Sequence, residues 1–262
     1  MKILEKNKFL YAEERKQEIL RLLEEQERVQ VVDLVDIFQV SGSTIRTNMR
    51  ELEKENLLTR THGGAIKRTK KNIEDNPKVR VLTDEKRRIA QYAVKLIDNE
   101  DCLIIDTGTS CLAFAEALVH CDVKKLHIVT GDLQIASILS EQTDYEVCIL
   151  GGVIRNGFQY AAGESVIRSI KTFSVDKAIL ATTSFTIEKG YSTPDIGTGE
   201  LKAAMMSISK QKIMLCESSK IGKESYKVFA KPTIADILVT DTGISKEDLV
   251  LLEEKNIYVK TV

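Results

Sequence analysis

Residues 102–119 of the chain read CLIIDTGTSCLAFAEALV, and this stretch decides the class of the larger domain. Its first part, Cys102–Ile105, is apolar and has the length of a strand, whereas apolar residues from Leu112 to Val119 recur at the spacing of a helix. Gly108, which lies between the two parts, permits a tight turn. The stretch therefore predicts a strand that turns directly into a helix, which is the repeating unit of α/β domains.

The same alternation continues towards the C-terminus. Six further apolar runs have the length of strands, at residues 126–129, 146–150, 178–181, 213–216, 237–239 and 257–259. Most of these runs are almost continuously apolar, as expected of strands that helices cover on both faces. Amphipathic stretches separate them, beginning with a predicted helix from Thr83 to about residue 98. We therefore predict that residues 81–262 form a doubly wound α/β domain with a mostly parallel sheet.

Three helices are predicted before this domain. Apolar residues recur at helical spacing over residues 13–26 and 31–39, and a third helix follows the predicted N-cap Ser41 and ends at about residue 55. The third helix has two distinct faces. Its apolar face carries Ile45, Met49 and Leu52, and its polar face carries Ser43, Arg46, Thr47 and Arg50.

A hairpin follows these helices. Strand-like pieces at 57–60 and 65–68 flank Gly63-Gly64, which is a hairpin signal. Helices followed by such a hairpin predict a winged helix-turn-helix over residues 1–68. The polar and charged segment 69–80 lacks periodicity and is the predicted linker.

A winged helix-turn-helix binds double-stranded operator DNA by placing its last helix in the major groove, while neighbouring parts contact phosphates. Arginine can read guanine, and hydroxyl groups can bond phosphates or bases. The predicted DNA-binding residues are Ser43, Thr44, Arg46, Thr47, Arg50, Arg60 and His62. Taken without further motifs, the three helices fit a small helical bundle with solvated charges equally well.

The composition excludes several classes of protein. A chain of 262 residues with 43% hydrophobic and 29% charged residues has the size of two domains and the make-up of a globular protein. Its apolar runs are shorter than the roughly 20 residues that span a bilayer, and charged residues follow Met1 where a signal peptide is apolar. We expect a cytoplasmic protein without membrane contact. Residues 1–80 carry a net charge of +3 and the remainder −4, a sign that fits DNA contact near the N-terminus.

No metal and no other cofactor is expected. The cysteines stand apart from one another without a CxxC pair, at positions 102, 111, 121, 148 and 216. The histidines are equally dispersed, at positions 62, 120 and 127. Neither set has the spacing of a structural zinc site.

Polar residues at the ends of the predicted strands indicate an anion site. The sequence Asp106-Thr107-Gly108-Thr109-Ser110 joins the first strand of the domain to its helix, and a helix N-terminus presents free N–H groups to a phosphate. In an open α/β sheet, groups at the carboxyl ends of the strands meet in one crevice. The predicted effector-binding residues are Asp106, Gly108, Thr109, Ser110, Gly152, Lys177, Lys202 and Lys220.

The motifs VSGSTIR at residues 40–46 and RTHGGA at residues 60–65 resemble the N-terminal signature of the DeoR family of bacterial transcription regulators. Members commonly continue the first motif with arginine, aspartate and leucine, where this chain has Thr47-Asn48-Met49. Thr47 removes a cation from the DNA-facing surface, so the operator sequence of relatives does not carry over to this chain.

The resemblance extends from about residue 13 to about residue 242. The family's sensor domain is similar in fold to ribose-5-phosphate isomerase, and members bind phosphorylated sugars, which implies a repressor of sugar-metabolism genes with a sugar phosphate as effector. Two departures stand out: Thr130-Gly131-Asp132 replaces the usual T-N-S, and Glu217 replaces aspartate before S-S-K. A carboxylate at Asp132 inside the site would oppose a phosphate, so either it pairs with a lysine or the effector is unusual.

Two other hypotheses stay open at this point. Carboxylates and lysines in the crevice also suit a phosphosugar isomerase-like enzyme, although no catalytic residue is assigned. An activator or architectural DNA binder without a ligand is the other. Under the repressor hypothesis we expect a homodimer or homotetramer, because repeated half-sites multiply the affinity for DNA.

Overall fold

The computed structural model describes residues 11–54, 57–61, 63–67, 82–155 and 157–262. The chain divides into two compact units, residues 1–79 and 80–262, and each is described by itself. The predicted linker, 69–80, and the predicted DNA-binding residue His62 lie outside the described residues.

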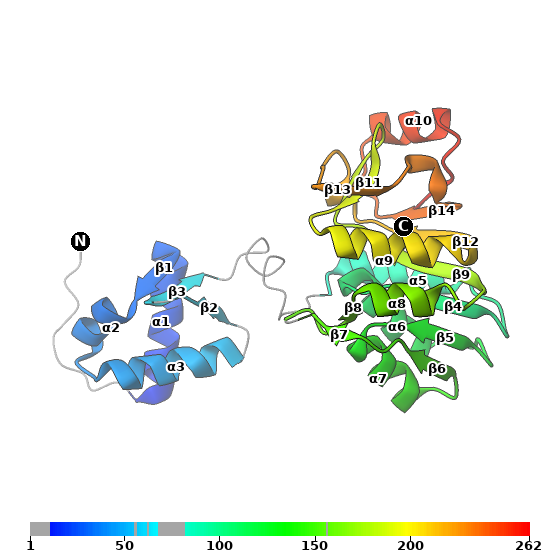
Figure 1. Ribbon diagram of the computed structural model, residues 1–262. Coiled ribbons are helices and arrows are strands. Elements are labelled where there is room, and N and C mark those ends of the chain that lie inside the picture. The colour runs from blue at the N-terminus through cyan, green and yellow to red at the C-terminus, as the bar shows by residue number, and fades with distance from the viewer. Residues whose placement is uncertain (1–10, 55–56, 62, 68–81, 156) are drawn as a thin grey trace. The chain divides into compact units, whose positions relative to one another are not determined.

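The described residues of the smaller unit form three helices and a three-stranded antiparallel sheet (Figure 1). The helices are α1 (Ala12–Gln26), α2 (Val31–Phe38) and α3 (Gly42–Lys54), and the strands are β1 (Arg28–Gln30), β2 (Leu58–Arg60) and β3 (Gly64–Lys67). The sheet has the order β1-β3-β2, so β2 and β3 form the predicted hairpin. The predicted helices and wing are confirmed, whereas β1 was not predicted, because three residues are too few to show a strand pattern.

Gly64 is required where the backbone of β1 lies close to β3. Its Cα pairs with Gln30, and a Cβ at this position would lie 1.9 Å from the carbonyl oxygen of Val29. The neighbouring Gly63 has nothing within 4 Å of the same position.

The larger unit is built on a seven-stranded sheet in the order β15-β14-β12-β9-β4-β5-β6, and all its neighbouring strands are parallel. The strands are β4 (Cys102–Ile105), β5 (His127–Thr130), β6 (Glu146–Ile149), β9 (Val175–Ala181), β12 (Ser209–Leu215), β14 (Ile237–Thr240) and β15 (Val259–Thr261). Each corresponds to one predicted apolar run, so the doubly wound parallel sheet is confirmed.

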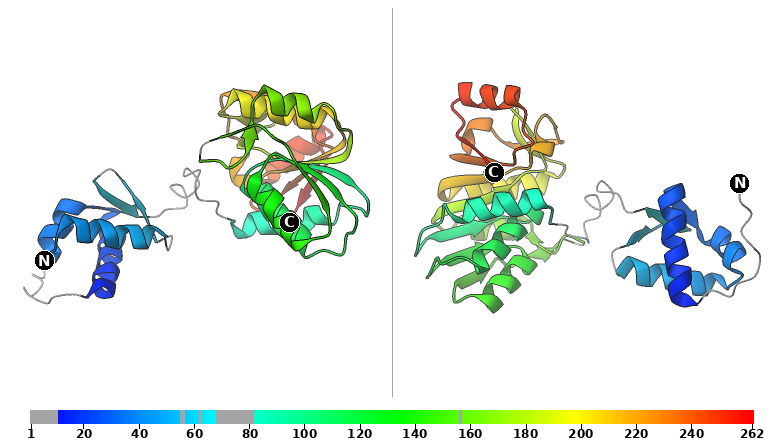
Figure 2. Two further views of the ribbon diagram at one scale, coloured as in Figure 1. Left: turned by 60° about the horizontal axis from the view of Figure 1, so that its bottom comes forward. Right: turned by 180° about the vertical axis from the view of Figure 1, so that it is seen from behind.

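Helices cover both faces of this sheet. One face carries α5 (Asp84–Val94), α6 (Thr109–Val119) and α7 (Leu133–Gln142), and the other carries α8 (Glu164–Ile170), α9 (Ile196–Ser207) and α10 (Lys246–Glu254). Successive residues of β4 therefore enter different cores: Leu103 and Ile105 join the α5 side, and Ile104 joins the α9 side. Figure 1 views the α8 and α9 side, and the rear view in Figure 2 shows the α5 side.

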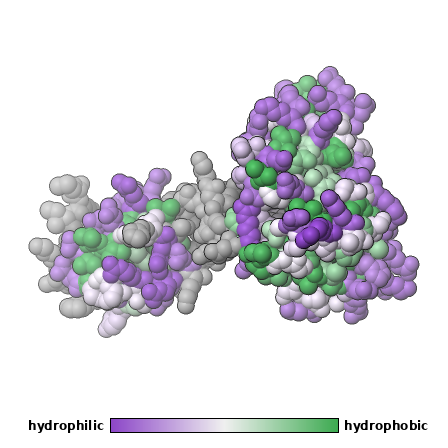
Figure 3. All heavy atoms as spheres, viewed as in Figure 1, coloured by the Kyte–Doolittle hydropathy of each residue, from purple (hydrophilic) through white to green (hydrophobic). Residues whose placement is uncertain are grey.

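Five short strands lie outside the large sheet and were not predicted. Two of them, β7 (Val153–Ile154) and β8 (Ala161–Ala162), form a hairpin, and three form a small antiparallel sheet, β10 (Ser184–Thr186), β11 (Gly190–Thr193) and β13 (Lys227–Ala230). On the face seen in Figure 3, hydrophobic residues form separate small areas among hydrophilic ones. Within the described part of the chain, no helix is both long and apolar enough to cross a membrane.

Gly64→Ala is expected to destabilise the smaller unit by about 1–3 kcal/mol, because the new methyl group forces β1 and β3 apart. Calorimetric unfolding of the full-length chain measures the effect. Gly63→Ala is the matched control and should leave the transition unchanged. Equal transitions for the two variants would show that β1 does not approach Gly64 as closely as described.

Candidate functional site

The third helix of the smaller unit presents one polar and one apolar face. Ser43, Arg46, Thr47 and Arg50 of α3 are exposed to solvent. Ile45, Met49 and Leu52 are at most 2% exposed and join the core of the unit. The predicted division of this helix is confirmed, and it leaves two guanidinium groups and several hydroxyl groups available to a ligand in solution.

Hydroxyl groups gather at the N-terminus of α3. The Oγ of Ser41 accepts a hydrogen bond from the N–H of Thr44 at 3.2 Å, so Ser41 caps the helix as predicted. The same Oγ lies 2.7 Å from the Oγ of Ser43 and 2.8 Å from the Oγ1 of Thr44. Because a helix N-terminus attracts anions, this hydroxyl cluster is suited to a DNA phosphate.

Two polar residues of α3 have structural partners. The Oδ1 of Asn48, a buried residue in the stretch that departs from the family pattern, accepts a hydrogen bond from the Nε of Arg15 at 2.9 Å and so ties α3 to α1. Glu53 accepts a hydrogen bond from the N–H of Arg60 at 3.0 Å, and its Oε2 lies 3.8 Å from the Arg60 Nε. Arg60 therefore joins the wing to α3 while remaining exposed.

In the larger unit, a buried ion pair lies at the carboxyl end of β4. Lys202 of α9 contacts the Oδ2 of Asp106 through its Nζ, which also donates to the carbonyl oxygen of Ala181 at 2.9 Å. The same Oδ2 accepts a hydrogen bond from the N–H of Ala181 at 3.2 Å. The other carboxylate oxygen, Oδ1, is buried and has no hydrogen-bond partner among the described residues. Asp106 thus has one satisfied oxygen and one that needs a donor.

The predicted anion loop follows Asp106 directly. Gly108 is the N-cap of α6 with a φ of 110°, a conformation that favours glycine, and no side chain caps this helix. By contrast, Thr83, Asp132 and Asp195 cap α5, α7 and α9 through their side chains. Thr109 and Ser110 begin α6, so the structure brings Asp106, Gly108, Thr109, Ser110 and Lys202 together as predicted.

Asp132 is the N-cap of α7. It is fully buried, and its Oδ1 accepts hydrogen bonds from the N–H groups of Gln134 and Ile135 at 3.1 and 3.2 Å. Its Oδ2 accepts a hydrogen bond from the Oγ1 of Thr107 at 2.6 Å. The carboxylate therefore caps α7 and ties it to the loop that follows β4.

A second buried cluster lies at the carboxyl end of β12. The Oε1 of Glu217 is 3.0 Å from the Nζ of Lys220 and 3.6 Å from the Nζ of Lys86. Its Oε2 accepts a hydrogen bond from the Oγ1 of Thr83 at 3.3 Å. Lys220 belongs to the short helix η1 (Ser218–Lys220), and Thr83 and Lys86 belong to the start of α5. Two ammonium groups share one carboxylate here.

Asp241, at the carboxyl end of β14, holds the same turn. It accepts hydrogen bonds from the N–H and Oγ of Ser218, both at 2.7 Å, and from the N–H of Gly243 at 3.0 Å. Burial alone would raise the pKa of Asp241, but these hydrogen bonds outweigh it and lower the pKa below its ordinary value.

The thiol of Cys111, in the first turn of α6, is fully buried. Burial raises its pKa well above the ordinary value, and the charges of Asp106, Lys202, Asp132 and Lys220 make smaller contributions. The sequence predicted all but Asp132 as members of one site.

An arginine cluster near the N-terminus of α9 was not predicted. The Nη1 of Arg155 donates hydrogen bonds to the hydroxyl oxygens of Tyr160 and Thr198, both at 2.9 Å, and lies 2.8 Å from the Oδ1 of Asp195. Asp195 in turn caps α9. The cluster ties the β7–β8 hairpin to α9, and only an arginine and a tyrosine in a short glycine-flanked segment signal it in the sequence.

The prediction that Lys177 joins this site is wrong. Its Nζ lies 2.8 Å from the Oδ2 of Asp98 and 2.5 Å from that of Asp101, two residues that precede β4. Lys177 is also the third residue of β9, so it lies at the amino ends of the strands, away from Asp106. Burial lowers its pKa, but the hydrogen bonds to Asp101 and Asp98 outweigh this and raise the pKa above its usual value.

Gly152 is explained by packing. A Cβ at this position would lie 2.4 Å from the Cγ2 of Val166, so the β7–β8 hairpin approaches α8 only with glycine there. This requirement accounts for the residue without a ligand.

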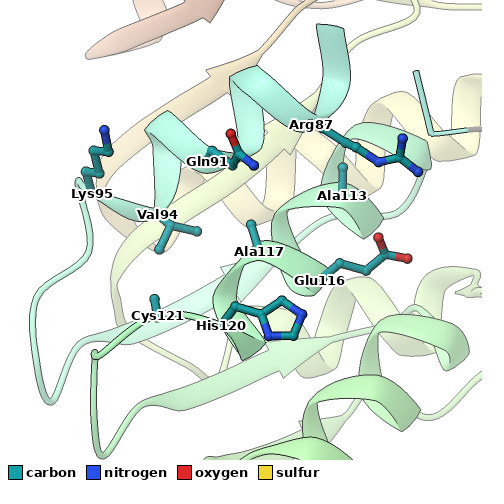
Figure 4. A pocket seen from close by; sticks show the side chains of 9 residues that line it. All are labelled: Arg87, Gln91, Val94, Lys95, Ala113, Glu116, Ala117, His120 and Cys121. Atoms are coloured by element: carbon teal, nitrogen blue, oxygen red, sulfur yellow. The ribbon is translucent and has the colours of Figure 1, made fainter. Parts of the chain in front are cut away.

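A groove of about 500 Å³ lies between α5 and α6 (Figure 4). Its lining residues are Arg87, Gln91, Val94, Lys95, Ala113, Glu116, Ala117, His120 and Cys121, and none of the predicted effector-binding residues is among them. Within the ranges that the structure covers, no group of three or more His, Cys, Asp or Glu side chains could hold a metal ion.

Comparison with known protein families agrees with both halves of the chain. The model of the DeoR C-terminal sensor domain matches residues 81–242, and that of the DeoR-like helix-turn-helix domain matches residues 15–71. The chain belongs to the DeoR family. This DeoR-family protein is therefore a DNA-binding transcription regulator with a helix-turn-helix and a sensor domain.

Curated relatives carry matching names. The uncharacterized HTH-type transcriptional regulator YulB of Bacillus subtilis is 31% identical over 95% of this chain and 96% of its own length. The HTH-type transcriptional repressor GlcR of the same species is 30% identical over 88% and 89%. The glycerol-3-phosphate regulon repressor of Escherichia coli is 30% identical over 85% and 88%.

Solved structures match more distantly. Ribose 5 phosphate isomerase A from Neisseria gonorrhoeae aligns with a TM-score of 0.39 and 19% identity over 52% of each chain. A transcriptional regulator from Streptococcus pneumoniae aligns with a TM-score of 0.42 and 13% identity over 80% of this chain and 99% of that one.

For this DeoR-family regulator, Arg46→Ala and Arg50→Ala are each expected to weaken DNA binding about tenfold or more, because each removes a side chain that can read guanine. Fluorescence anisotropy with a duplex that the wild-type protein selects from random sequences measures the affinity. Arg21→Ala is the control, since that guanidinium pairs with Glu18 on α1. Unchanged affinity in both α3 variants would remove this face from the DNA interface.

Asp241→Asn is expected to lower the free energy of unfolding at neutral pH. The folded-state pKa of Asp241 is depressed, so its stabilisation is fully present above the ordinary aspartate pKa of about 3.9 and is lost as the pH falls through the folded pKa. Urea unfolding at several pH values should show the difference between wild type and variant shrinking in acid. A constant difference would contradict this origin.

Proposed function

We propose that this protein represses sugar-metabolism genes and that a phosphorylated sugar, bound at the carboxyl ends of β4 and β12, controls its hold on operator DNA. The observation that carries the proposal is the N-terminus of α6, uncapped by any side chain, beside the half-satisfied carboxylate of Asp106. The two features are suited to bind different parts of one ligand.

The N-terminus of α6 is suited to bind an anion. N–H groups of the first helical turn, the helix dipole and the hydroxyl groups of Thr109 and Ser110 all favour negative charge. Lys220 adds a partly exposed ammonium group, whose side chain is 23% exposed. Lys202 already forms an ion pair with Asp106, so Lys220 is the stronger candidate for direct contact with a phosphate.

The Oδ1 of Asp106 can accept a hydrogen bond from a ligand. Its Oδ1 is a buried acceptor without a partner among the described residues, and leaving such an atom unsatisfied costs about 1–3 kcal/mol. A phosphate dianion has no proton to offer, whereas a sugar hydroxyl does. A ligand that combines a phosphate with nearby hydroxyl groups satisfies both features.

Repression and assembly are part of the proposal. The names of GlcR and the glycerol-3-phosphate regulon repressor state that those relatives repress transcription, which supports the same direction of control here. We expect a homodimer or homotetramer acting on repeated half-sites in the cytoplasm. Light scattering coupled to size-exclusion chromatography would contradict this by showing a monomer. Steady turnover of pentose or hexose phosphates by the purified protein would favour the isomerase-like alternative.

Sugar phosphates are expected to raise the melting temperature of the full-length protein, and Lys220→Ala is expected to remove most of that increase, because it deletes a phosphate contact. A thermal-shift screen of pentose, hexose and triose phosphates measures it. Lys210→Ala is the matched control, since Lys210 lies at the amino end of β12 and pairs with Asp176. Lys177→Met should also keep the increase, because Lys177 lies at the amino ends of the strands.

Free sugars that stabilise the protein as strongly as their phosphates would overturn the anion site. An increase that Lys220→Ala leaves intact would remove Lys220 from it.

A further inference from the structure

We infer that Glu217 is a positioning residue that couples the anion site to the segment leading to the DNA-binding unit. This inference rests on the proposed function of the site. Glu217 contacts Lys220, which faces the proposed anion, and also Thr83 and Lys86 at the start of α5. The helix α5 is the first element that the structure describes after residue 81, so its first turn continues the predicted linker.

In this cluster, the ammonium groups of Lys220 and Lys86 compete for one oxygen atom, the Oε1 of Glu217. The Oε1 of Glu217 lies 3.0 Å from the Nζ of Lys220 but 3.6 Å from that of Lys86, so Lys220 holds the closer position. Glu217 and Lys86 have side chains only 6% and 4% exposed, whereas the Lys220 side chain is 23% exposed. Lys220 is therefore the member of the cluster that an incoming anion can reach.

An anion shifts this competition. A phosphate at the N-terminus of α6 attracts Lys220 and withdraws it from Glu217. Because a buried carboxylate needs a cation, Glu217 then closes the longer distance to Lys86. The Oε2 of Glu217 keeps its hydrogen bond from Thr83, so ligand binding tightens the first turn of α5 against the sheet.

The first turn of α5 is well placed to respond. Thr83 is its N-cap and accepts a hydrogen bond from the N–H of Lys86 at 3.3 Å, so Glu217 holds both the capping residue and the residue that it caps. The helix packs against α6, β12 and β14, the elements that build the site. Asp241 fixes Ser218 from the other side, so the turn carrying Lys220 does not drift when its partner changes.

Hydrogen exchange in variants of the full-length chain tests the competition without any ligand. Lys220→Gln leaves Glu217 to Lys86 and should slow exchange of residues 84–90 about threefold. Glu217→Gln removes the carboxylate that Lys220 and Lys86 share and should speed exchange of the same residues about threefold. A merely structural cluster would loosen in both variants, and that outcome would overturn the inference. Lys210→Gln, the same change at the other end of β12, should leave residues 84–90 unaltered.

Inorganic phosphate, compared with chloride at equal ionic strength, tests the coupling itself. In the wild type, phosphate should slow exchange at 106–112 and at 84–90, whereas in Glu217→Gln it should slow exchange at 106–112 alone. Protection of 106–112 without a change at 84–90 in the wild type would overturn the coupling and leave the proposed anion site standing. No protection at 106–112 would overturn both.

Discussion

The contact between Asp106 and Lys202 sets the geometry of the sensor domain, because neither charge can stay buried alone. Removing one partner of such a pair costs about 3–5 kcal/mol. The pair joins the end of β4 to α9, and both residues also bond the backbone of Ala181 at the end of β9. The loop that begins at Asp106 is thus fixed by α9, which lies on one face of the sheet. The helix α6, which follows the loop, covers the opposite face.

Carboxylates hold the turns at the other strand ends as well. Asp132 caps α7, Glu217 contacts α5, and Asp241 holds the turn of η1. Asp132 and Asp241 accept hydrogen bonds from N–H groups of their own turns and Glu217 contacts two lysines, so the proposed anion site tolerates these carboxylates. The cations and the N–H groups that remain accessible decide the sign of the ligand.

The sequence predicted the seven parallel strands because each contains or adjoins an apolar run of strand length, and most of these runs are almost continuously apolar. It did not show β1, β7, β8, β10, β11 or β13, since these short segments establish no period. In the site, Asp106 and Lys202 were found because strand ends converge. Lys177 was misplaced because it precedes the apolar run that begins at Ala178 and so lies near the amino end of β9, at the opposite edge of the sheet. The contacts of Thr107 with Asp132 and of Lys86 with Glu217 join distant parts of the chain, which no local pattern shows.

The departure from the family pattern at Glu217 gains a physical meaning from these contacts. Glutamate is one methylene longer than the aspartate usual at this position, and the extra length lets one carboxylate reach Lys220 on its own turn and both Thr83 and Lys86 on α5. A shorter side chain anchored at the same Cα would favour the nearer lysine, which is three residues away in the chain. The substitution therefore extends a local ion pair into a link between η1 and α5. Coupling of this kind needs only a shared acceptor and two donors at unequal distances, so a small movement of Lys220 is enough to change the contacts of α5.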